Sequence, residues 1–319
     1  MIKRLLLAGC LLAGLVPARA GAQTPPSEDV EATPVAELVV RGRLPGPAWW
    51  RVSDGDSTVF VLGMPEALPK GMAWDTSVLE RRLAGANALI TPPIIQASVN
   101  LFALPKLLID ANSAGRSKVA IDQRLPNGLA ARLERASVTA GEPPDAFAHT
   151  PPWIAGVRLA GRYHRRVGLD YREPLSGIRR LARAAGVKPA PADAARGKAS
   201  ALLQELRTIP DDVSRRCVEA VVAEVETGDA PVRAAARAWA AGDVRMVLDR
   251  PRSSELCFAL LPGAGATKRD SLELQANAIQ AALEKPGHAV AALSLRSVVA
   301  RGGVLERLRA RGLKVEAPE

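Results

Sequence analysis

The sequence predicts an α+β fold in which strands from both ends of the chain form one mixed sheet around a large, all-helical middle. β-rich runs occur at residues 49–53 and 58–62, and again near the C-terminus at 288–295 and 313–317. Between them, residues 144–261 carry apolar side chains at helical spacing, with short breaks. Helices that cover a sheet built from both ends of the chain would bury the apolar faces of all these elements.

The first elements of the domain alternate between strand and helix. The β-rich runs at 49–53 and 58–62 are separated by Asp-Gly-Asp-Ser, a turn-forming cluster that predicts a hairpin. A helix is predicted over residues 74–86, with Asp75 or Thr76 as its N-cap. A buried strand at residues 87–94 follows and is stopped by two prolines.

The remaining elements follow from the same patterns. Residues 97–113 predict a helix broken at Pro105, and residues 118–122 predict a short strand. Further helices are predicted at residues 127–141, where Gly141 closes the helix, and at 271–287 and 302–312.

The first 22 residues have the pattern of an export signal peptide. Lys3 and Arg4 precede an apolar run, and small residues then allow cleavage after Ala20 or Ala22. The apolar run is too short to span a bilayer, and no later segment is long and apolar enough to do so. The mature protein is therefore predicted to be periplasmic or secreted, without a transmembrane segment.

Two features near the signal peptide bear on the domain organisation. Cys10 allows an alternative in which the protein is an outer-membrane lipoprotein, which is less favoured because few apolar residues precede it. Residues 23–46 are rich in Pro, Glu and Thr and predict a flexible leader. Residues 47–319 then form the folded domain, with a helical insert at about 144–261.

The charge of the chain argues against one class of partner. The formal charge falls from +10 to +7 when Lys3, Arg4 and Arg19 leave with the signal peptide. The other arginines are spread along predicted helices without interleaved aromatic residues, which favours solvated helix faces over nucleic-acid binding. Weak attraction to anionic lipid or cell-wall polymer stays open.

Cys217 and Cys257 are the cysteines that remain after cleavage. In an oxidising compartment two thiols usually pair, so we predict a structural disulfide between them. Two buried free thiols are the alternative. A redox-active pair is disfavoured because the spacing is not that of a CxxC motif.

Three segments carry a resemblance to a known family. They are residues 49–75, residues 151–160 followed by Gly-Leu-Asp, and residues 287–315. Together they resemble the TraB/GumN family, which also includes the PrgY and Tiki proteins, over nearly the whole mature chain. Typical members have a strand that leads to a GxxH motif, then Leu-Pro, a Gly and a Trp. The matching residues here are Gly63, Leu68, Pro69, Gly71 and Trp74.

The resemblance implies a metal-dependent hydrolase, but this sequence departs from the family at the implied metal-site positions. Family members place metal-binding histidines in two GxxH motifs and an acid at the end of the strand between them. Neutral imidazole and carboxylate suit a metal that activates water. Here Glu66 replaces the first histidine, Thr91 replaces the acid, and Ser294 and Ser297 replace the Gly and His of the second motif. We therefore expect no metal at this site.

Glu66 has three interpretations. As a metal ligand it would need partners better than Thr91 and Ser297, and as a general base it would need a positioned substrate. The third interpretation is structural, in which its carboxylate caps the turn or pairs with Lys70 or Arg296. We hypothesise that an ion pair between Glu66 and Arg296, with side-chain ends within ~6 Å, replaces the metal.

The histidines and Asp170 offer no better candidates. His149, His164 and His288 lie in unrelated segments, so a histidine-rich metal site is not expected. The surrounding arginines of His164 indicate a solvated helix face. Asp170 falls where family members usually keep an Asp, and we favour a turn or N-cap role for it before the helix predicted at 174–186.

The function favoured by these observations is that of a pseudoenzyme. The protein would be an exported, non-catalytic binding or accessory protein of the cell envelope, without a cofactor, whose partner is an envelope peptide, polymer or protein. The alternative is a hydrolase or peptidase that uses Glu66 in a divergent site, and a divalent metal is expected only in that case. A purely structural envelope protein is the third hypothesis.

Overall fold

The structure is a computed structural model that describes residues 46–93, 95–98, 112–170, 172–191, 195–198, 208–249, 253–261 and 263–318. The predicted signal peptide, the leader up to residue 45, and most of the helix predicted at 97–113 lie outside the described residues. Within the described part of the chain, no helix is both long and apolar enough to cross a bilayer.

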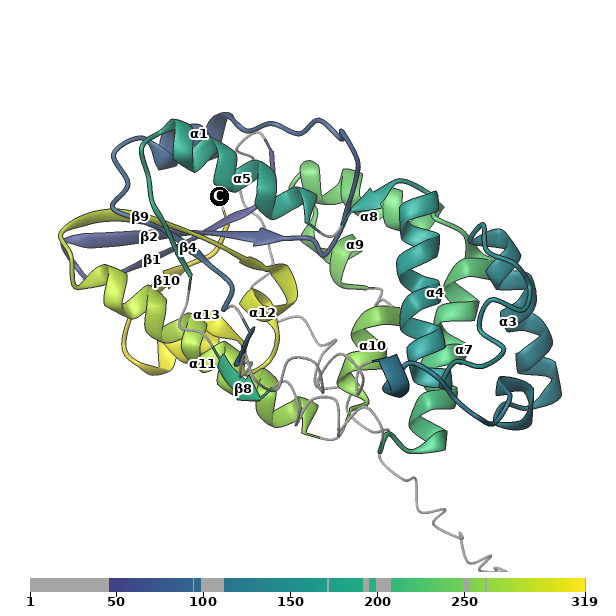
Figure 1. The fold of residues 1–319 in the computed structure, drawn as a ribbon. Coiled ribbons are helices and arrows are strands. Elements are labelled where there is room, and N and C mark those ends of the chain that lie inside the picture. Colours follow the sequence, from purple (N-terminus) through teal and green to yellow (C-terminus); the bar gives the residue numbers. More distant parts are fainter. Residues whose placement is uncertain are drawn as a thin grey trace, which may run out of the picture.

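The core of the fold is a mixed, six-stranded sheet built mainly from the two ends of the chain (Figure 1). Its strand order is β10-β1-β2-β9-β4-β7. β1 runs antiparallel to β2 and β10, whereas β2, β9, β4 and β7 run parallel. The α+β prediction is therefore confirmed. The strands are β1 (Trp49–Ser53), β2 (Ser57–Met64), β4 (Leu89–Thr91), β7 (Pro189–Pro191), β9 (Gly287–Ser294) and β10 (Lys314–Glu316).

The register of the central strands determines which segments of the chain leave the sheet at the same edge. The predicted hairpin is present, with Trp49 opposite Leu62 in β1 and β2. β2 and β9 pair in parallel along their whole length, from Ser57 beside Gly287 to Met64 beside Ser294. Since both strands end together, the residues that follow them leave the sheet at the same edge.

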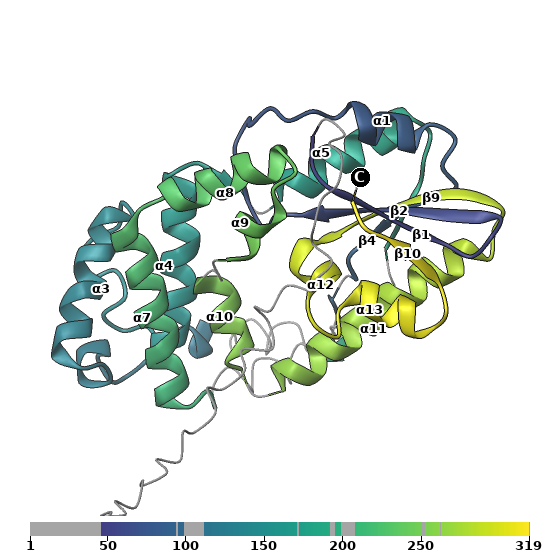
Figure 2. The same ribbon diagram turned by 180° about the vertical axis from the view of Figure 1, so that it is seen from behind.

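Helices cover both faces of the sheet (Figures 1 and 2). On one face, α11 (Ala264–Leu283), α12 (Leu295–Val299) and α13 (Val304–Ala310) pack on alternate strand residues such as Val61 and Ala291. On the other face, α1 (Ser77–Leu83) and α5 (Glu173–Ala184) pack on Leu62 and Val290. The strands are apolar on both faces, as buried parallel strands usually are.

The helical middle forms a second apolar core beside the sheet. It consists mainly of α3 (Asn127–Thr139), α4 (Pro152–Arg166), α7 (Asp211–Thr227) and α10 (Ser253–Ala259), which pack through buried leucine, valine and alanine side chains. α8 (Ala230–Ala240) and α9 (Val244–Leu248) lie between this core and the sheet (Figure 2). The predicted pairing of Cys217 with Cys257 is confirmed: the disulfide joins α7 to α10, and the two Cα atoms are 4.7 Å apart.

Some local predictions were wrong. Residues 121–123 form a short 3-10 helix, η2 (Ile121–Gln123), rather than part of a strand, because Ile121 packs into the helical core and the backbone closes local hydrogen bonds. A helix was predicted from residue 97, but residues 97 and 98 belong to the strand β5 (Ile95–Ser98). β5 pairs in parallel with β8 (Ala195–Lys198), and this pairing keeps its backbone extended.

The helical middle also contributes short strands that the sequence did not predict. β7 extends the main sheet, and β6 (Leu169–Asp170) pairs antiparallel with β3 (Leu68–Pro69). These segments have two to four residues, too few for a periodic pattern, so pairing with a distant strand is what makes them extended.

Candidate functional site

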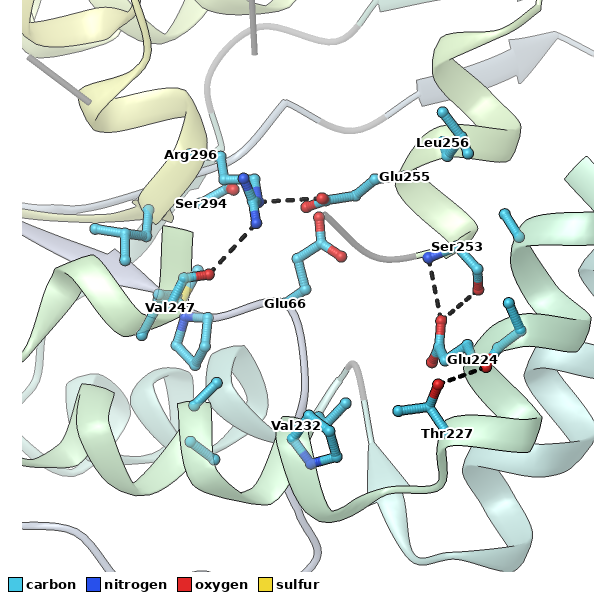
Figure 3. A pocket seen from close by; sticks show the side chains of 18 of the residues that line it. Glu66, Glu224, Thr227, Val232, Val247, Ser253, Glu255, Leu256, Ser294 and Arg296 are labelled. Atoms are coloured by element: carbon cyan, nitrogen blue, oxygen red, sulfur yellow. Dashed lines mark hydrogen bonds and ion pairs between the residues drawn. The ribbon is translucent and has the colours of Figure 1, made fainter. Parts of the chain in front are cut away.

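A cavity of about 270 Å³ lies where the C-terminal ends of β2 and β9 meet the helical middle (Figure 3). Its wall comes from the loop after β2, from α12, and from α7, α8, α9 and α10. The edge at the C-terminal ends of parallel strands is the usual ligand position in sheets covered by helices. The in-register pairing of β2 with β9 therefore brings two distant segments of the sequence into one wall.

Three of the residues singled out from the sequence line this cavity. Glu66 comes from the loop after β2, whereas Ser294 ends β9 and Arg296 lies in α12. Glu66 is about 230 residues away from Ser294 and Arg296 in the chain, and the parallel register, with Met64 beside Ser294, brings them together.

Three other residues that the sequence singled out are not among the described residues that line this cavity: Gly63, Thr91 and Ser297. An added Cβ at Gly63 would lie 2.5 Å from Leu295 Cδ1 and 3.1 Å from Trp50 Cζ3, so a larger residue there would require these buried side chains to move. Thr91 is fully buried at the end of β4, where its hydroxyl accepts a 3.5 Å hydrogen bond from Arg179. Thr91 and Ser297 are thus not among the described residues that line the cavity with Glu66.

Arg296 links the sheet side of the cavity to the helical side. Its Nε lies 3.0 Å from Glu255 Oε2 in α10, and its Nη2 donates to the carbonyl of Val247 in α9 at 3.3 Å. The side chains of Arg296 and Glu255 are both 15% exposed. Because both side chains are mostly buried, solvent screens this ion pair less than it screens a pair on the surface.

Glu66 projects into the same region, and its carboxylate points toward Glu255 and Arg296 (Figure 3). The hypothesis of an ion pair between Glu66 and Arg296 stays a prediction. Glu255 was not anticipated from the sequence, since a single acid in the segment Ser-Ser-Glu-Leu-Cys-Phe carries no periodic or motif signal.

The third carboxylate of the cavity wall belongs to Glu224 in α7, and residues of α4 and α10 hold it by hydrogen bonds. Its Oε1 lies 2.5 Å from His164 Nε2, and its Oε2 accepts hydrogen bonds from the hydroxyl and, at 3.1 Å, the backbone N–H of Ser253. Burial raises the pKa of Glu224, but the hydrogen bonds from His164 and Ser253 outweigh it and lower the pKa to about 2. Glu224 is therefore an anion at neutral pH, and its hydrogen bonds are made within the protein.

The prediction that His164 lies on a solvated helix face was wrong. Its side chain is buried because α4 turns Tyr163 and His164 toward α7, while Arg162 and Arg165 on the same turn face solvent. One feature of the sequence could have indicated that His164 has a buried partner. Glu224 is an acid among the valines of an otherwise apolar helix face.

The other histidines and Asp170 lie away from the cavity. His288 is the second residue of β9, at the far end of the strand from Ser294, and its Nε2 lies 3.0 Å from the carbonyl oxygen of Arg82. His149 is exposed. Asp170 accepts a 2.7 Å hydrogen bond from the backbone N–H of Arg172 just before α5, which agrees with a turn role.

The donor set of this cavity does not fit the metal that the family resemblance implies. Among the described residues, no three His, Cys, Asp or Glu side chains are grouped so that they could hold a metal ion. Arg296 also places a positive charge beside Glu255, which would repel a divalent cation. What the described residues of the wall offer instead is three carboxylates, from Glu66, Glu224 and Glu255, together with the guanidinium of Arg296 and an extended apolar surface.

A comparison with protein families matches the TraB/PrgY/gumN family to residues 48–317, which is most of the chain. Comparisons with curated proteins and with solved structures gave no significant match.

Proposed function

The chain belongs to the TraB/PrgY/gumN family, and we propose that it is an exported member that has lost its hydrolytic metal site and acts as a non-catalytic binding or accessory protein of the cell envelope. The N-terminal signal pattern supports export, and the positions of Glu66, Thr91, Ser294 and Ser297 support the loss of the metal site. The partner would be an envelope peptide, polymer or protein.

The ion pair of Arg296 with Glu255 is the observation that carries this proposal. A divalent metal in a cavity neutralises the carboxylates around it, and a guanidinium does the same with fixed hydrogen-bond geometry. Arg296 donates to both Glu255 and the carbonyl of Val247. Positive charge is thus supplied by the protein, but a guanidinium offers no coordination position for a water and does not lower the pKa of a bound water as a metal does.

The cavity itself supports a retained binding role. Most of its wall is apolar, and it carries a few polar groups, Glu66, Glu255 and Arg296 in one place and Glu224 and Ser253 in another; a mostly apolar wall with a few polar groups is the usual composition of a ligand site. A purely structural envelope protein would be expected to fill such a space with side chains, because voids in a core weaken packing.

Metal analysis and a hydrolysis assay test the proposal. Purified mature protein, incubated with Zn²⁺ or Mn²⁺ and then dialysed, should contain far less than one metal per chain. It should hydrolyse a peptide library no faster than Glu66→Gln does. One tightly bound metal per chain, together with metal-dependent hydrolysis that Glu66→Gln abolishes, would refute the proposal.

The alternative function is a hydrolase or peptidase that uses Glu66 in a divergent site. It is favoured by one observation, that Glu66 and Glu255 face the same cavity, since paired carboxylates can serve as general acid and base. Metal-free hydrolysis that is lost in Glu66→Gln and kept in Glu219→Gln, an exposed acid on α7, would favour this alternative.

A further inference from the structure

A second cavity, of about 450 Å³, lies at the opposite end of α7 from the candidate site. The candidate site meets α7 at Ala220 and Thr227, whereas this second cavity meets it at Ser214, near the start of the helix. α4 lies beside α7 (Figure 1), and its first residues, which include Trp153 and Ile154, line the same cavity. The N-termini of two long helices therefore meet at one space, which we call the N-terminal cavity.

The start of α4 supplies backbone donors to the N-terminal cavity. Hydrogen bonding along this helix begins at Ala155, whose N–H donates to the carbonyl of Pro151 at 2.9 Å. Trp153 and Ile154 come earlier, so their N–H groups have no partner within the helix. The first turn contains no acidic residue, and Pro151 at the N-cap has no side-chain acceptor. The partial positive charge of this helix end is thus not offset by the helix itself.

Two basic side chains, from Arg116 and Lys118, lie in the wall of the same cavity. The backbone between them is tied to the residues that lead into α4, because the N–H of Ser117 donates to the carbonyl of His149 at 2.8 Å. This contact holds both basic residues near the start of α4, although they are far from it in the sequence.

The N-terminal cavity is lined by donors rather than by acids. Among the described residues that line it there is no Asp or Glu. Arg124, a third basic residue of the wall, forms an ion pair with Asp211 at the start of α7. Within the described part of the chain, Arg116 and Lys118 form no ion pair of this kind.

A buried hydroxyl is the independent sign of a ligand. Ser214 lines the N-terminal cavity and is only 3% exposed. Its backbone N–H donates to the carbonyl of Pro210 at 3.0 Å, but its hydroxyl makes no hydrogen bond with any described residue. Buried hydroxyls nearly always have a partner, because an unsatisfied one is costly. An acceptor bound in this cavity would supply that partner.

We propose that the N-terminal cavity binds a phosphate group through Arg116, Lys118, the hydroxyl of Ser214 and the N–H groups at the start of α4. Phosphate oxygens accept hydrogen bonds, and each of these protein groups can donate one. Arginine, lysine and helix N-termini are common partners of phosphate. The volume of about 450 Å³ far exceeds the ~30 Å³ share of one water molecule, so a phosphate with a small organic group can enter. This site is separate from the candidate site and does not depend on the function proposed above.

Calorimetric titration of the mature protein in a phosphate-free buffer tests this proposal. The probes are inorganic phosphate, sn-glycerol 3-phosphate and glycerol. Both phosphates should bind, and glycerol should not, because it lacks the charged oxygens. Equal affinity for the two phosphates would show that the phosphate alone is recognised. Tighter binding of sn-glycerol 3-phosphate would indicate a phosphate ester, such as a lipid headgroup.

Variants locate the binding site. Arg116→Gln, Lys118→Gln and Ser214→Ala should each weaken phosphate binding by roughly five- to ten-fold, as expected for the loss of one charge-assisted hydrogen bond. Arg116 and Lys118 are exposed, so their variants should fold normally. Arg180→Gln is the matched control: it removes the same charge from an exposed position of α5, outside this cavity, and should leave binding unchanged.

Three results would overturn the phosphate proposal. They are an absence of phosphate binding by folded wild-type protein, an unchanged affinity in all three cavity variants, and an equal loss of affinity in Arg180→Gln, which would indicate a general charge effect. None of these results bears on the proposed function, whose failure appears instead as bound metal and metal-dependent hydrolysis.

Discussion

Burial and hydrogen bonding shift the pKa of Glu224 in opposite directions. Its side chain is 15% exposed, and burial alone would favour the neutral acid. Contacts with His164 and Ser253 favour the anion more strongly and hold the pKa at about 2, below the ordinary 4.5. Because the native state prefers the ionised form more than the unfolded chain does, Glu224 stabilises the fold above about pH 4.5, and this stabilisation is lost as the pH falls toward 2.

Replacing Glu224 should therefore change how the free energy of unfolding depends on pH. Glu224→Gln should lower the free energy of unfolding at pH 7 by on the order of 2–3 kcal/mol, because the charge-assisted hydrogen bonds are lost. The difference from wild type should shrink below about pH 4 and nearly vanish near pH 2. Urea unfolding at a series of pH values measures this.

Glu219→Gln is the matched control, since Glu219 is an exposed residue of the same helix, and it should follow the wild-type curve. Parallel curves for wild type and Glu224→Gln at all pH values would contradict the role given to this carboxylate.

At the scale of elements, α10 depends on contacts with its neighbours. It has seven residues, too few to be stable in isolation. The disulfide ties its Cys257 to α7, Ser253 binds Glu224 of α7, and Trp153 of α4 donates a 3.1 Å hydrogen bond to the carbonyl of Cys257. These contacts fix the helix that presents Glu255 and Leu256 to the cavity.

Removal of the disulfide should destabilise the whole protein and loosen this wall. The bond joins residues 40 positions apart, and closing a loop of that length contributes about 4 kcal/mol on the chain-entropy model. The double variant Cys217→Ala/Cys257→Ala should lose roughly 2–5 kcal/mol of unfolding free energy. Guanidinium unfolding measures this.

Wild-type protein treated with a reductant in denaturant and refolded in its presence should lose a similar amount, since both samples lack the bond. Equal stability of the double variant and oxidised wild type would contradict a stabilising role. A loss confined to the double variant would assign the effect to the alanine side chains instead.

At the scale of the molecule, the cavity is assembled from all three parts of the chain. The N-terminal strands contribute the loop with Glu66, the helical middle contributes Glu255, and the C-terminal part contributes Arg296. The ion pair between Glu255 and Arg296 joins the helical core to the sheet. A change in the relative position of the two cores would alter the cavity directly.

The predicted export of the whole chain can be checked on the expressed protein. In a bacterial host, cell fractionation should place it outside the cytoplasm, and N-terminal sequencing should begin at Gly21 or Gln23, because the small residues before these positions suit cleavage. Cys10→Ala is the matched control and should be processed and released in the same way. A mature chain that begins at a lipidated Cys10, and a failure of Cys10→Ala to be processed, would support the lipoprotein alternative instead.

Much of the fold could be predicted from the sequence because it depends on local patterns. The β1–β2 hairpin follows from two β-rich runs around a turn cluster, and α3 follows from apolar spacing and the closing Gly141. Where local patterns were weak, the predictions failed: Ile121 is buried by helical packing rather than by a sheet, and β7 is extended because it pairs with β4.

For the candidate site, Glu66 and Arg296 were identified from sequence because a family motif made their positions conspicuous, and the parallel register of β2 and β9 accounts for their common cavity. Glu224, Ser253 and Glu255 had no comparable signal. They become neighbours of the site only through the packing of α7 and α10, and His164 is buried for the same reason. Patterns within a segment thus predict its structure and its motif residues, whereas long-range packing sets which charges face one another.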